Sequence, residues 1–513
     1  MVIFVAGSIN KMGKKLAGEW AQRVIIRKEI DKYLIDGKDF IHEEDIFVRL
    51  RKNDNPDQKL IRDILQKSLS ITTLSPDETA ALLNVTSPEI WEEIFQAALE
   101  VKKKVYDNRI VFFAPLYCSN YCVNNCAYCG FREANNHEVR RILTIDEIKR
   151  ETSSVLNEGH KRLILVFGEH QRSDVDYMAA AVRAVYSVEE PAPVSGHPSS
   201  IRRVNINAAP MEMAKLKILK EAGIGTYQVF QETYHHETYR AVHPANTLKG
   251  DYQWRLYALH RAIEAGLDDV AIGALFGLYD WRFEVMGLLY HTLDLERQFG
   301  IGPHTISFPR MTPASGSSLS SDSMYHVSDS DFKKLVAVLR LSVPTAGMIV
   351  TAREKAAIKK EVIQLGCTQT DASTRIGIGA YSDQKTENDL DKKQFTIGDP
   401  RDLDDVIQEV GKLGFIASFC TAGYRCGRTG ETIMGMLSHC VEGKFCKLNA
   451  VLTFREYLSD YASPATREIG EPLILKEIRE IESMEYFKSK PHLLKKFRSD
   501  YSEILSGKRD LYL

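Results

Sequence analysis

The stretch YCSNYCVNNCAYCGF, residues 117–131, carries three cysteines in C-x3-C-x2-C spacing, namely Cys122, Cys126 and Cys129. Three thiolates this close on one loop can bind three irons of a [4Fe–4S] cube, which leaves the fourth iron open. An open iron can chelate the amino and carboxylate groups of S-adenosylmethionine (SAM), and one electron from the cube then cleaves the sulfonium. The spacing therefore predicts a [4Fe–4S] cluster with an open iron, SAM as its cofactor and a 5′-deoxyadenosyl radical as its product.

Two other uses of these cysteines stay open at this point. Cys118 could supply the fourth ligand that a structural zinc site needs. A disulfide cluster is less favoured, because nothing else in the chain is typical of a secreted protein. Cys118 also forms a C-x3-C pair with Cys122, but Asn125 stands where the third cysteine would have to be. We therefore expect one triad, with Cys118 as a buried thiol.

Composition places the chain among ordinary globular proteins. It has 513 residues, of which 44% are hydrophobic and 27% charged, and a formal net charge of −2. This length suits one large barrel with extensions. The balanced charge predicts neither nucleic acid nor an anionic membrane as a partner, and no apolar run reaches the roughly 18 residues of a membrane span.

The nine cysteines indicate the compartment. An odd number in two local clusters favours metal ligation in a reducing compartment over a disulfide framework. We expect the cytoplasm, or the matrix of an anaerobic organelle if the first 28 residues are a presequence. Those residues are basic, although an ordinary solvated helix explains them equally well: Lys11, Lys14, Lys15, Arg23, Arg27 and Lys28.

Residues 1–105 predict a helical lead-in, because apolar positions recur at helical spacing in 59–69 and 87–104. Ser75-Pro76-Asp77-Glu78 is typical of a helix start. From residue 106 onward, runs rich in β-branched and aromatic residues alternate with helical patterns. The predicted strands are 109–117, 161–168, 202–209, 226–233, 269–278, 304–311, 347–354 and 367–374, and the predicted helices are 144–159, 175–188, 211–223, 252–266, 281–300, 331–343 and 356–366.

Alternation of this kind implies parallel strands joined by crossover helices. Eight such strands predict an α/β fold of the (β/α)8 TIM-barrel type over residues 106–383, with an open doubly wound sheet as the alternative. The cysteine loop follows the first strand, at the carboxyl end where such barrels place chemistry. Residues 379–400 predict a linker or mobile loop, and 384–513 a mostly helical domain whose apolar C-terminal tripeptide docks on it.

Polar residues at the predicted strand ends are candidate cofactor ligands. Gly168 would let a ligand approach the backbone, and Glu169 could accept from the ammonium group of SAM. An exposed acid at a turn is the alternative for Glu169. Asn205 and Asn207 share one face of the third strand and could point into the barrel, either toward a cofactor or as a satisfied polar layer.

Three further features are less specific. His304 opens the sixth strand and is either structural or a metal ligand. Arg375 ends the eighth strand, where a guanidinium could clamp a substrate carboxylate, or pair with Asp371. A second group of cysteines could form another iron–sulfur site or consist of buried free thiols: Cys420, Cys426, Cys440 and Cys446.

From about Pro76 to Leu513 the chain resembles the HydG-type [FeFe]-hydrogenase maturases, radical SAM tyrosine lyases related to the thiazole-pathway 2-iminoacetate synthase ThiH. The motifs that carry the resemblance are SNYCVNNCAYCGF, RRVNIN, GIGTYQVFQETYH, GPHTISFPR, SFCTAGYRCGRTG and the final RDLYL. The resemblance implies a barrel that binds the cluster and SAM, and cleavage of the Cα–Cβ bond of L-tyrosine to p-cresol and dehydroglycine (2-iminoacetate).

The resemblance also implies residue roles and partners. Cys122, Cys126 and Cys129 match the ligands of the SAM cluster, Glu169 falls in the motif for the SAM amine, and His304 matches a ligand of a labile iron at a second cluster. That second cluster converts dehydroglycine to CO and cyanide for the hydrogenase H-cluster. The implied partners are an electron donor such as ferredoxin or flavodoxin and other hydrogenase maturation proteins.

One departure from the family pattern affects the second cluster. The family uses C-x2-C-x22-C, which here corresponds to Cys420, Gly423 and Cys446, so the middle ligand is missing unless Cys426 replaces it. Tyrosine cleavage is therefore better supported than CO and cyanide production. The alternatives are a lyase for tyrosine or another aromatic amino acid that stops at dehydroglycine, and a non-catalytic iron–sulfur carrier.

Overall fold

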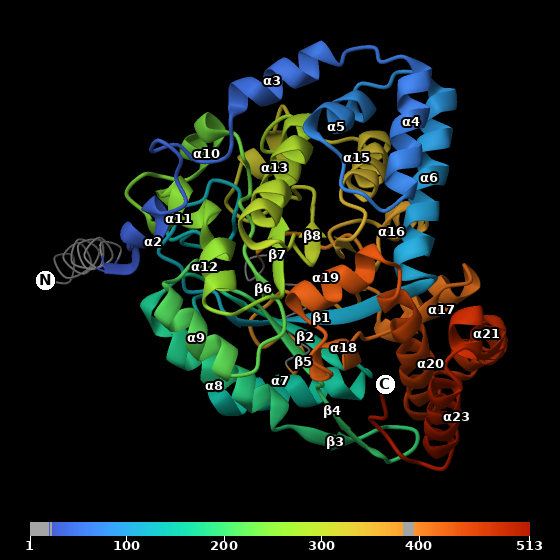
Figure 1. Ribbon diagram of the computed structural model, residues 1–513. Helices are drawn as coiled ribbons and strands as arrows, with labels where there is room; N and C mark the ends of the chain where they lie inside the picture. Colours follow the sequence, from blue (N-terminus) through green and yellow to red (C-terminus); the bar gives the residue numbers. More distant parts are fainter. Residues whose placement is uncertain (1–19, 21–22, 383–393) are drawn as a thin grey trace, which may run out of the picture.

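The computed structural model describes residue 20, residues 23–382 and residues 394–513. Eight parallel strands form a barrel at its centre, and pairing of the eighth strand with the first closes it (Figure 1). The eight predicted strands are confirmed, and the open-sheet alternative is wrong because every barrel strand has a neighbour on both sides. In barrel order the strands are β1 (Arg109–Ser119), β2 (Arg162–Phe167), β5 (Arg203–Asn207), β6 (Tyr227–Gln228), β7 (Val270–Gly273), β8 (Thr305–Ser307), β9 (Gly347–Val350) and β10 (Gln369–Asp371).

The crossover helices lie where the sequence predicts them, with one exception. The predicted helix 252–266 is split at Tyr257, whose φ of −90° and ψ of 15° interrupt the helical path. A short hairpin of β3 (Glu189–Pro191) and β4 (Pro198–Ser200) follows the second crossover helix. The helices are α7 (Ile145–Asn157), α8 (Val175–Tyr186), α9 (Met213–Glu221), α10 (His236–Val242), α11 (Tyr252–Leu256), α12 (Ala258–Glu264), α13 (Trp281–Phe299), α14 (Leu319–Asp322), α15 (Asp329–Ser342) and α16 (Ala356–Leu365), with short 3-10 turns η1 (Gln171–Ser173) and η2 (Leu248–Gly250).

The helical lead-in packs on α15 of the barrel, as the blue helices of Figure 1 show. The Ser68 hydroxyl donates to the Leu341 carbonyl at 2.8 Å, and the Tyr106 hydroxyl donates to the Thr345 carbonyl at 2.6 Å. The helix start at Ser75 is confirmed as a capping box with Glu78. The lead-in helices are α2 (Lys28–Asp31), α3 (Glu43–Lys52), α4 (Gln58–Leu69), α5 (Pro76–Leu83) and α6 (Pro88–Tyr106).

His236 at the start of α10 joins the lead-in to the segment that follows β6. Its Nδ1 lies 2.8 Å from Glu43 Oε1 and its Nε2 lies 3.2 Å from Asp39 Oδ2. Burial alone would lower the pKa of His236, but the hydrogen bonds with the two carboxylates outweigh it and raise the pKa above the usual value. The protonated imidazole therefore stabilises this contact.

The raised pKa of His236 predicts a pH-dependent stability. A histidine whose folded-state pKa is raised contributes fully below its unfolded pKa of about 6.5 and loses that contribution as the pH rises through the folded value. We therefore expect the thermal midpoint of the wild type to fall more between pH 6 and pH 8 than that of His236→Gln. Equal changes in the two proteins would contradict this prediction.

The C-terminal helices, red in Figure 1, lie beside the amino-terminal end of β1. The apolar run before the second cysteine group forms β11 (Ile416–Ser418), which pairs with the first residues of β1 from outside the barrel. The docking of the C-terminal tripeptide is confirmed, since Leu513 is buried and its amide donates to Asn449 Oδ1 at 2.9 Å. The helices are α17 (Leu403–Lys412), α18 (Ala422–Arg425), α19 (Gly430–Ser438), α20 (Glu442–Asp460), α21 (Pro464–Ser483), α22 (Glu485–Lys488) and α23 (Pro491–Leu505).

Some predictions fall outside the described residues. These are most of the presequence at 1–28, the boundary at 383/384 between barrel and C-terminal domain, and the centre of the linker 379–400. The division into 1–105, 106–383 and 384–513 stays a prediction. In the part of the chain that the structure describes, no helix has the length and apolar character that a membrane crossing requires.

Candidate active site

A cavity of about 220 Å³ opens at the carboxyl end of the barrel. The cysteine loop after β1 supplies part of its wall, and the ends of the other barrel strands supply the rest. Parallel strands converge at this end, so residues far apart in the sequence meet there. The predicted residues that line the cavity are Cys122, Cys126, Cys129, Gly168, Glu169 and Asn207.

Asn124 fixes the cysteine loop against two other segments. Its Nδ2 donates to Glu169 Oε2 at 2.5 Å and lies 3.8 Å from the sulfur of Cys122, while its Oδ1 accepts from the amide of Lys249 at 2.9 Å. The hydroxyl of Tyr128 lies 2.8 Å from Nε2 of the buried His243. The loop is thus held from β2 on one side and from the segment after β6 on the other.

Gly168 occupies a position where a side chain cannot fit. A Cβ atom placed there would lie 2.2 Å from the carbonyl oxygen of Tyr121 in the cysteine loop, and the Gly168 amide donates to the Ser119 carbonyl at 2.9 Å. Backbone atoms on both sides cannot move aside as a flexible side chain could. The glycine therefore sets how closely the end of β2 approaches the cysteine loop.

Glu169 presents a buried carboxylate to the cavity, so the alternative of an exposed turn acid is wrong. Burial raises the pKa of Glu169, while the guanidinium of Arg255 and the hydrogen bond from Asn124 act in the opposite direction. A buried carboxylate beside the cysteine loop is suited to accept hydrogen bonds from an ammonium group.

The sulfurs of Cys122, Cys126 and Cys129 do not all lie within 4.8 Å of one another. Four thiolates around zinc, each about 2.3 Å from the metal, lie about 3.8 Å from one another. In the described ranges, one group of three metal-ligating side chains has its ligand atoms within 4.8 Å of one another. It consists of the carboxylates of Asp107, Glu477 and Glu480 and contains no cysteine. Cys118 is buried, does not line the cavity and contacts the Leu116 carbonyl at 3.7 Å. The triad therefore fits a cluster of several irons better than a zinc ion.

An ionic group in the cavity wall escaped the sequence analysis. The ammonium of Lys249 lies 2.6 Å, and the guanidinium of Arg255 3.5 Å, from Glu232 Oε1. Burial alone would raise the pKa of Glu232, but these two cations outweigh it and hold the pKa below its usual value. Glu232 also has a φ of 73°, a strained value for a residue with a side chain and one that is frequent at functional sites. Nothing in the linear sequence marks Lys249 or Arg255, because the loop after β6 brings them to the cavity.

The structure does not bring Arg375 to the cavity. Its guanidinium lies 3.6 Å from Glu158 Oε1 and donates to the Ala380 carbonyl at 3.3 Å. Its neighbours Thr374 and Ile376 line the cavity instead, and the Thr374 hydroxyl donates to Asp371 Oδ2 at 2.6 Å.

Arg353, three residues beyond the end of β9, is half-buried and lines the cavity, as does the buried Arg255. Its carbon Cζ lies 3.3 Å from the ring centre of Phe395, and its Nη1 donates to the hydroxyl of Thr312 at 3.4 Å. The signal for it in the sequence was its place near the end of the predicted strand 347–354. Gln394 also reaches the site, with its Nε2 3.7 Å from the sulfur of Cys129. Residues 394 and 395 lie outside any helix or strand, within the predicted linker or loop, and their side chains pack into the cavity wall.

The two asparagines of β5 lie at different depths. Asn207, at the carboxyl end of the strand, lines the cavity. Asn205 does not, because it lies one layer deeper, where its Oδ1 accepts from the amide of Thr226 at 2.9 Å and from Nε of Arg203 at 3.2 Å. Its surroundings match the alternative of a satisfied polar layer.

The second cysteine group lies at the opposite end of the barrel. Cys420 and Cys446 line a small cavity of about 10 Å³, together with Gly423 and Arg109. A hydrogen bond from Cys446 and the nearby guanidinium groups lower the pKa of Cys420 well below its usual value. His304 is buried just before β8 and does not line this cavity; its Nδ1 has no hydrogen-bond partner within the described ranges. Cys426 is exposed.

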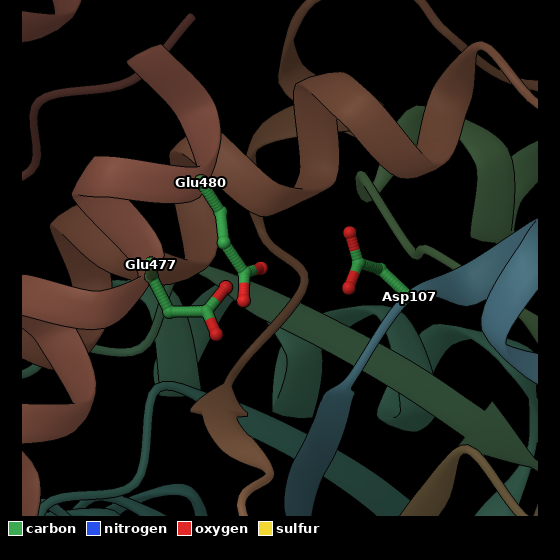
Figure 2. Close-up of side chains that lie close together, drawn as sticks. All are labelled: Asp107, Glu477 and Glu480. Atoms are coloured by element: carbon green, nitrogen blue, oxygen red, sulfur yellow. The ribbon is translucent and has the colours of Figure 1, made fainter. Parts of the chain in front are cut away.

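Three carboxylates converge around Lys447, the residue that follows Cys446; Figure 2 shows the three carboxylates. Asp107 precedes β1, and Glu477 and Glu480 lie on α21. The ammonium of the buried Lys447 lies 3.1 Å from Asp107 Oδ2, 2.7 Å from Glu477 Oε2 and 2.8 Å from Glu480 Oε2. The ammonium group of Lys447 thus compensates the negative charge of the three carboxylates. These ion pairs also join α20 and α21 to the start of the barrel.

Known proteins are similar to this chain in sequence and in fold. Residues 116–285 match the model of the Radical SAM superfamily, and residues 307–416 match that of the Biotin and Thiamin Synthesis associated domain. The 2-iminoacetate synthase of Salmonella typhimurium is 30% identical over 376 residues, which cover 72% of this chain and 91% of that protein. A solved structure of HydG, a maturase of the [FeFe]-hydrogenase, is 41% identical with a TM-score of 0.85, covering 93% of this chain and 100% of that one. HydG from Carboxydothermus hydrogenoformans is 34% identical with a TM-score of 0.74, covering 88% and 97%.

The barrel, the cysteine loop at its carboxyl end and the match over residues 116–285 define a radical SAM enzyme. Such an enzyme binds a [4Fe–4S] cluster and SAM, and the cysteine triad with Glu169 suits both. Because the similarity to the solved HydG structure extends over 93% of the chain, the chain belongs to the HydG-type family of radical SAM enzymes.

Proposed function

We propose that this protein cleaves the Cα–Cβ bond of L-tyrosine and releases p-cresol and dehydroglycine. The observation that carries the proposal is that one cavity combines the cysteine triad, the buried carboxylate of Glu169 and the half-buried guanidinium of Arg353. The 2-iminoacetate synthase and HydG relatives support it.

Each of these groups has a distinct task in the proposed reaction. Cys122, Cys126 and Cys129 would hold the cluster, which together with SAM supplies the 5′-deoxyadenosyl radical that takes hydrogen from the tyrosine amine. Glu169 would accept hydrogen bonds from the SAM ammonium group. Arg353 would bind the tyrosine carboxylate through two parallel N–H donors, which orients the amine toward the cofactor.

The test is anaerobic incubation of the reconstituted protein with SAM, dithionite and tyrosine. We expect p-cresol and 5′-deoxyadenosine in equal amounts. If both are absent while the cluster is intact, the proposal is wrong. A non-catalytic iron–sulfur carrier would instead transfer its cluster to an acceptor protein without consuming SAM.

A second candidate function is the full reaction to CO and cyanide for the hydrogenase H-cluster. It is favoured by the similarity to HydG structures, which includes the C-terminal helices, whereas the match to 2-iminoacetate synthase covers 72% of the chain. It requires a second cluster at Cys420 and Cys446, and trapping of CO with haemoglobin tests it. An electron donor such as ferredoxin or flavodoxin and other maturation proteins would be the partners, in the cytoplasm or the matrix of an anaerobic organelle.

The role of Arg353 leads to a prediction about tyrosine binding. Charge-assisted hydrogen bonds contribute about 1.5–3 kcal/mol, so Arg353→Met should lower kcat/KM for tyrosine by roughly 10–100-fold, mainly through KM. Arg375→Met is the matched control and should stay within about 3-fold of wild type, because its guanidinium contacts Glu158 outside the cavity. A larger loss in Arg375→Met than in Arg353→Met would restore the original assignment of the clamp to Arg375.

A further inference from the structure

The small cavity at the base of the barrel differs in its donors from the family pattern of three cysteines. We propose that in this chain the base of the barrel holds no iron–sulfur cube and is a two-thiol pocket with room for one small ligand. If the proposed tyrosine cleavage is correct, dehydroglycine would then be the final product of this enzyme.

The donor set is the first argument. All nine cysteines of the chain lie in the described ranges, and two of them, Cys420 and Cys446, line the base cavity. The position between them in the family pattern is Gly423, which lines the same cavity and offers no ligand atom. A cube is held by cysteine thiolates, and with two of them half of its irons would have no protein ligand.

The size of the cavity is the second argument. Its volume is about 10 Å³, compared with about 220 Å³ for the cavity beside the first cysteine loop. The smaller volume corresponds to about one water-sized occupant. Side chains from α20 and from the C-terminal end fill the surrounding space, among them Asn449, Thr453 and Tyr512. A cube would have to displace them.

Cys426 cannot easily replace the cysteine that is missing at position 423. It is exposed, and the residues around it are fixed to the C-terminal end of the chain. Arg425 Nη1 forms an ion pair with Asp510 Oδ2 at 2.6 Å, and Arg425 Cζ lies 4.0 Å from the ring centre of Tyr512. Arg428 donates to the Leu513 carbonyl at 2.9 Å. To bring the Cys426 thiol into the cavity, the exposed turn that these contacts hold would have to move.

The other side of the pocket is equally fixed. Cys446 directly precedes Lys447, which three carboxylates hold (Figure 2). Lys447 and Glu477 are both buried, and separating them would leave a buried charge without its partner, which opposes a shift of α20 that would enlarge the cavity. Both walls of the two-thiol pocket therefore resist the rearrangement that a cube would need.

The experiment is an iron count on a chain that lacks the first cluster. The triple variant Cys122→Ala, Cys126→Ala, Cys129→Ala is reconstituted anaerobically with iron and sulfide, and bound iron is measured chemically and by Mössbauer spectroscopy. We expect at most one iron per chain. Two or more irons per chain with a cluster spectrum would overturn the inference, whether or not the additional change Cys426→Ala removes them.

Two further measurements test the inference in case the triple cysteine variant folds poorly. Gly423→Cys added to the triple variant supplies the third donor, and at most one bound iron is still expected, because the side chains around the cavity leave no room for a cube. About four bound irons in this variant would show that space is not limiting and would overturn the argument from the size of the cavity. In the otherwise natural chain, Cys420→Ala should leave the iron content unchanged at about four per chain, whereas a loss of four would contradict the inference. Production of p-cresol by the wild type tests the proposed lyase activity separately, so the two proposals can fail independently.

Discussion

The variant Cys126→Ala is expected to form no 5′-deoxyadenosine above background when it is incubated with SAM and dithionite. Cys126 lines the cavity between the other two cysteines of the triad, and burial raises the pKa of its thiol to about 12 when no metal compensates the charge. A thiol in this environment gains from binding iron, which takes the place of its proton. Loss of one of three thiolates leaves a cube with two, and neither the cluster nor the site for SAM should persist.

The matched control for this prediction is Cys118→Ala. Cys118 lies on β1 only a few residues before the triad, is equally buried and does not line the cavity. Its removal should cost some stability and leave the iron content and SAM cleavage close to wild type. If Cys118→Ala loses the cluster as well, a four-cysteine site would replace the open-iron site argued above.

The second large effect is expected for Gly168→Ala. The added methyl group would lie 2.2 Å from the Tyr121 carbonyl oxygen and 3.0 Å from its carbon, so the end of β2 and the cysteine loop must separate. Displacements of about 1 Å at a reacting centre cost roughly 100-fold in rate. We therefore expect SAM cleavage to fall by at least about 100-fold, with a weaker affinity for SAM measured by equilibrium binding.

Gly435→Ala serves as the control for the effect of the substitution itself. Gly435 lies in α19, is exposed and has no atom within 4 Å of the position of an added Cβ. Alanine is favoured over glycine in a helix by about 1 kcal/mol, so this variant should be as stable as wild type or slightly more stable. Activity in Gly168→Ala equal to that of Gly435→Ala would show that the close approach is dispensable.

Most of the fold could be predicted because its signals are local. The eight strands of the barrel are short apolar runs, and each crossover helix carries its own pattern, such as the capping box of Thr144 and Glu147. β11 was not predicted as a strand because its three residues pair with β1 only through the arrangement of the whole C-terminal part. The break at Tyr257 likewise depends on tertiary packing, which periodicity does not report.

The site could be predicted only where its residues adjoin a strand end or share a loop. The cysteine triad, Gly168 and Glu169 met that condition. Arg375 was expected at the end of the eighth strand, but β10 ends at Asp371, and the guanidinium contacts Glu158 outside the cavity. A signal at the base was overlooked: three neighbouring strands each begin at a buried arginine, namely Arg109 in β1, Arg162 in β2 and Arg203 in β5. Charged residues at the same end of adjacent strands indicate a polar layer of the barrel.

The length of β1 affects how a small molecule could pass from one end of the barrel to the other. β1 is continuous over 11 residues, from Arg109 beside the two-thiol pocket to Ser119 before the cysteine loop, and at about 3.3 Å per residue it spans roughly 33 Å. β1 pairs with β11 and β10 over its first residues and with β2 over its last, so the sheet fixes the separation of its two ends. A labile molecule made at one end would have to diffuse over that length to reach the other.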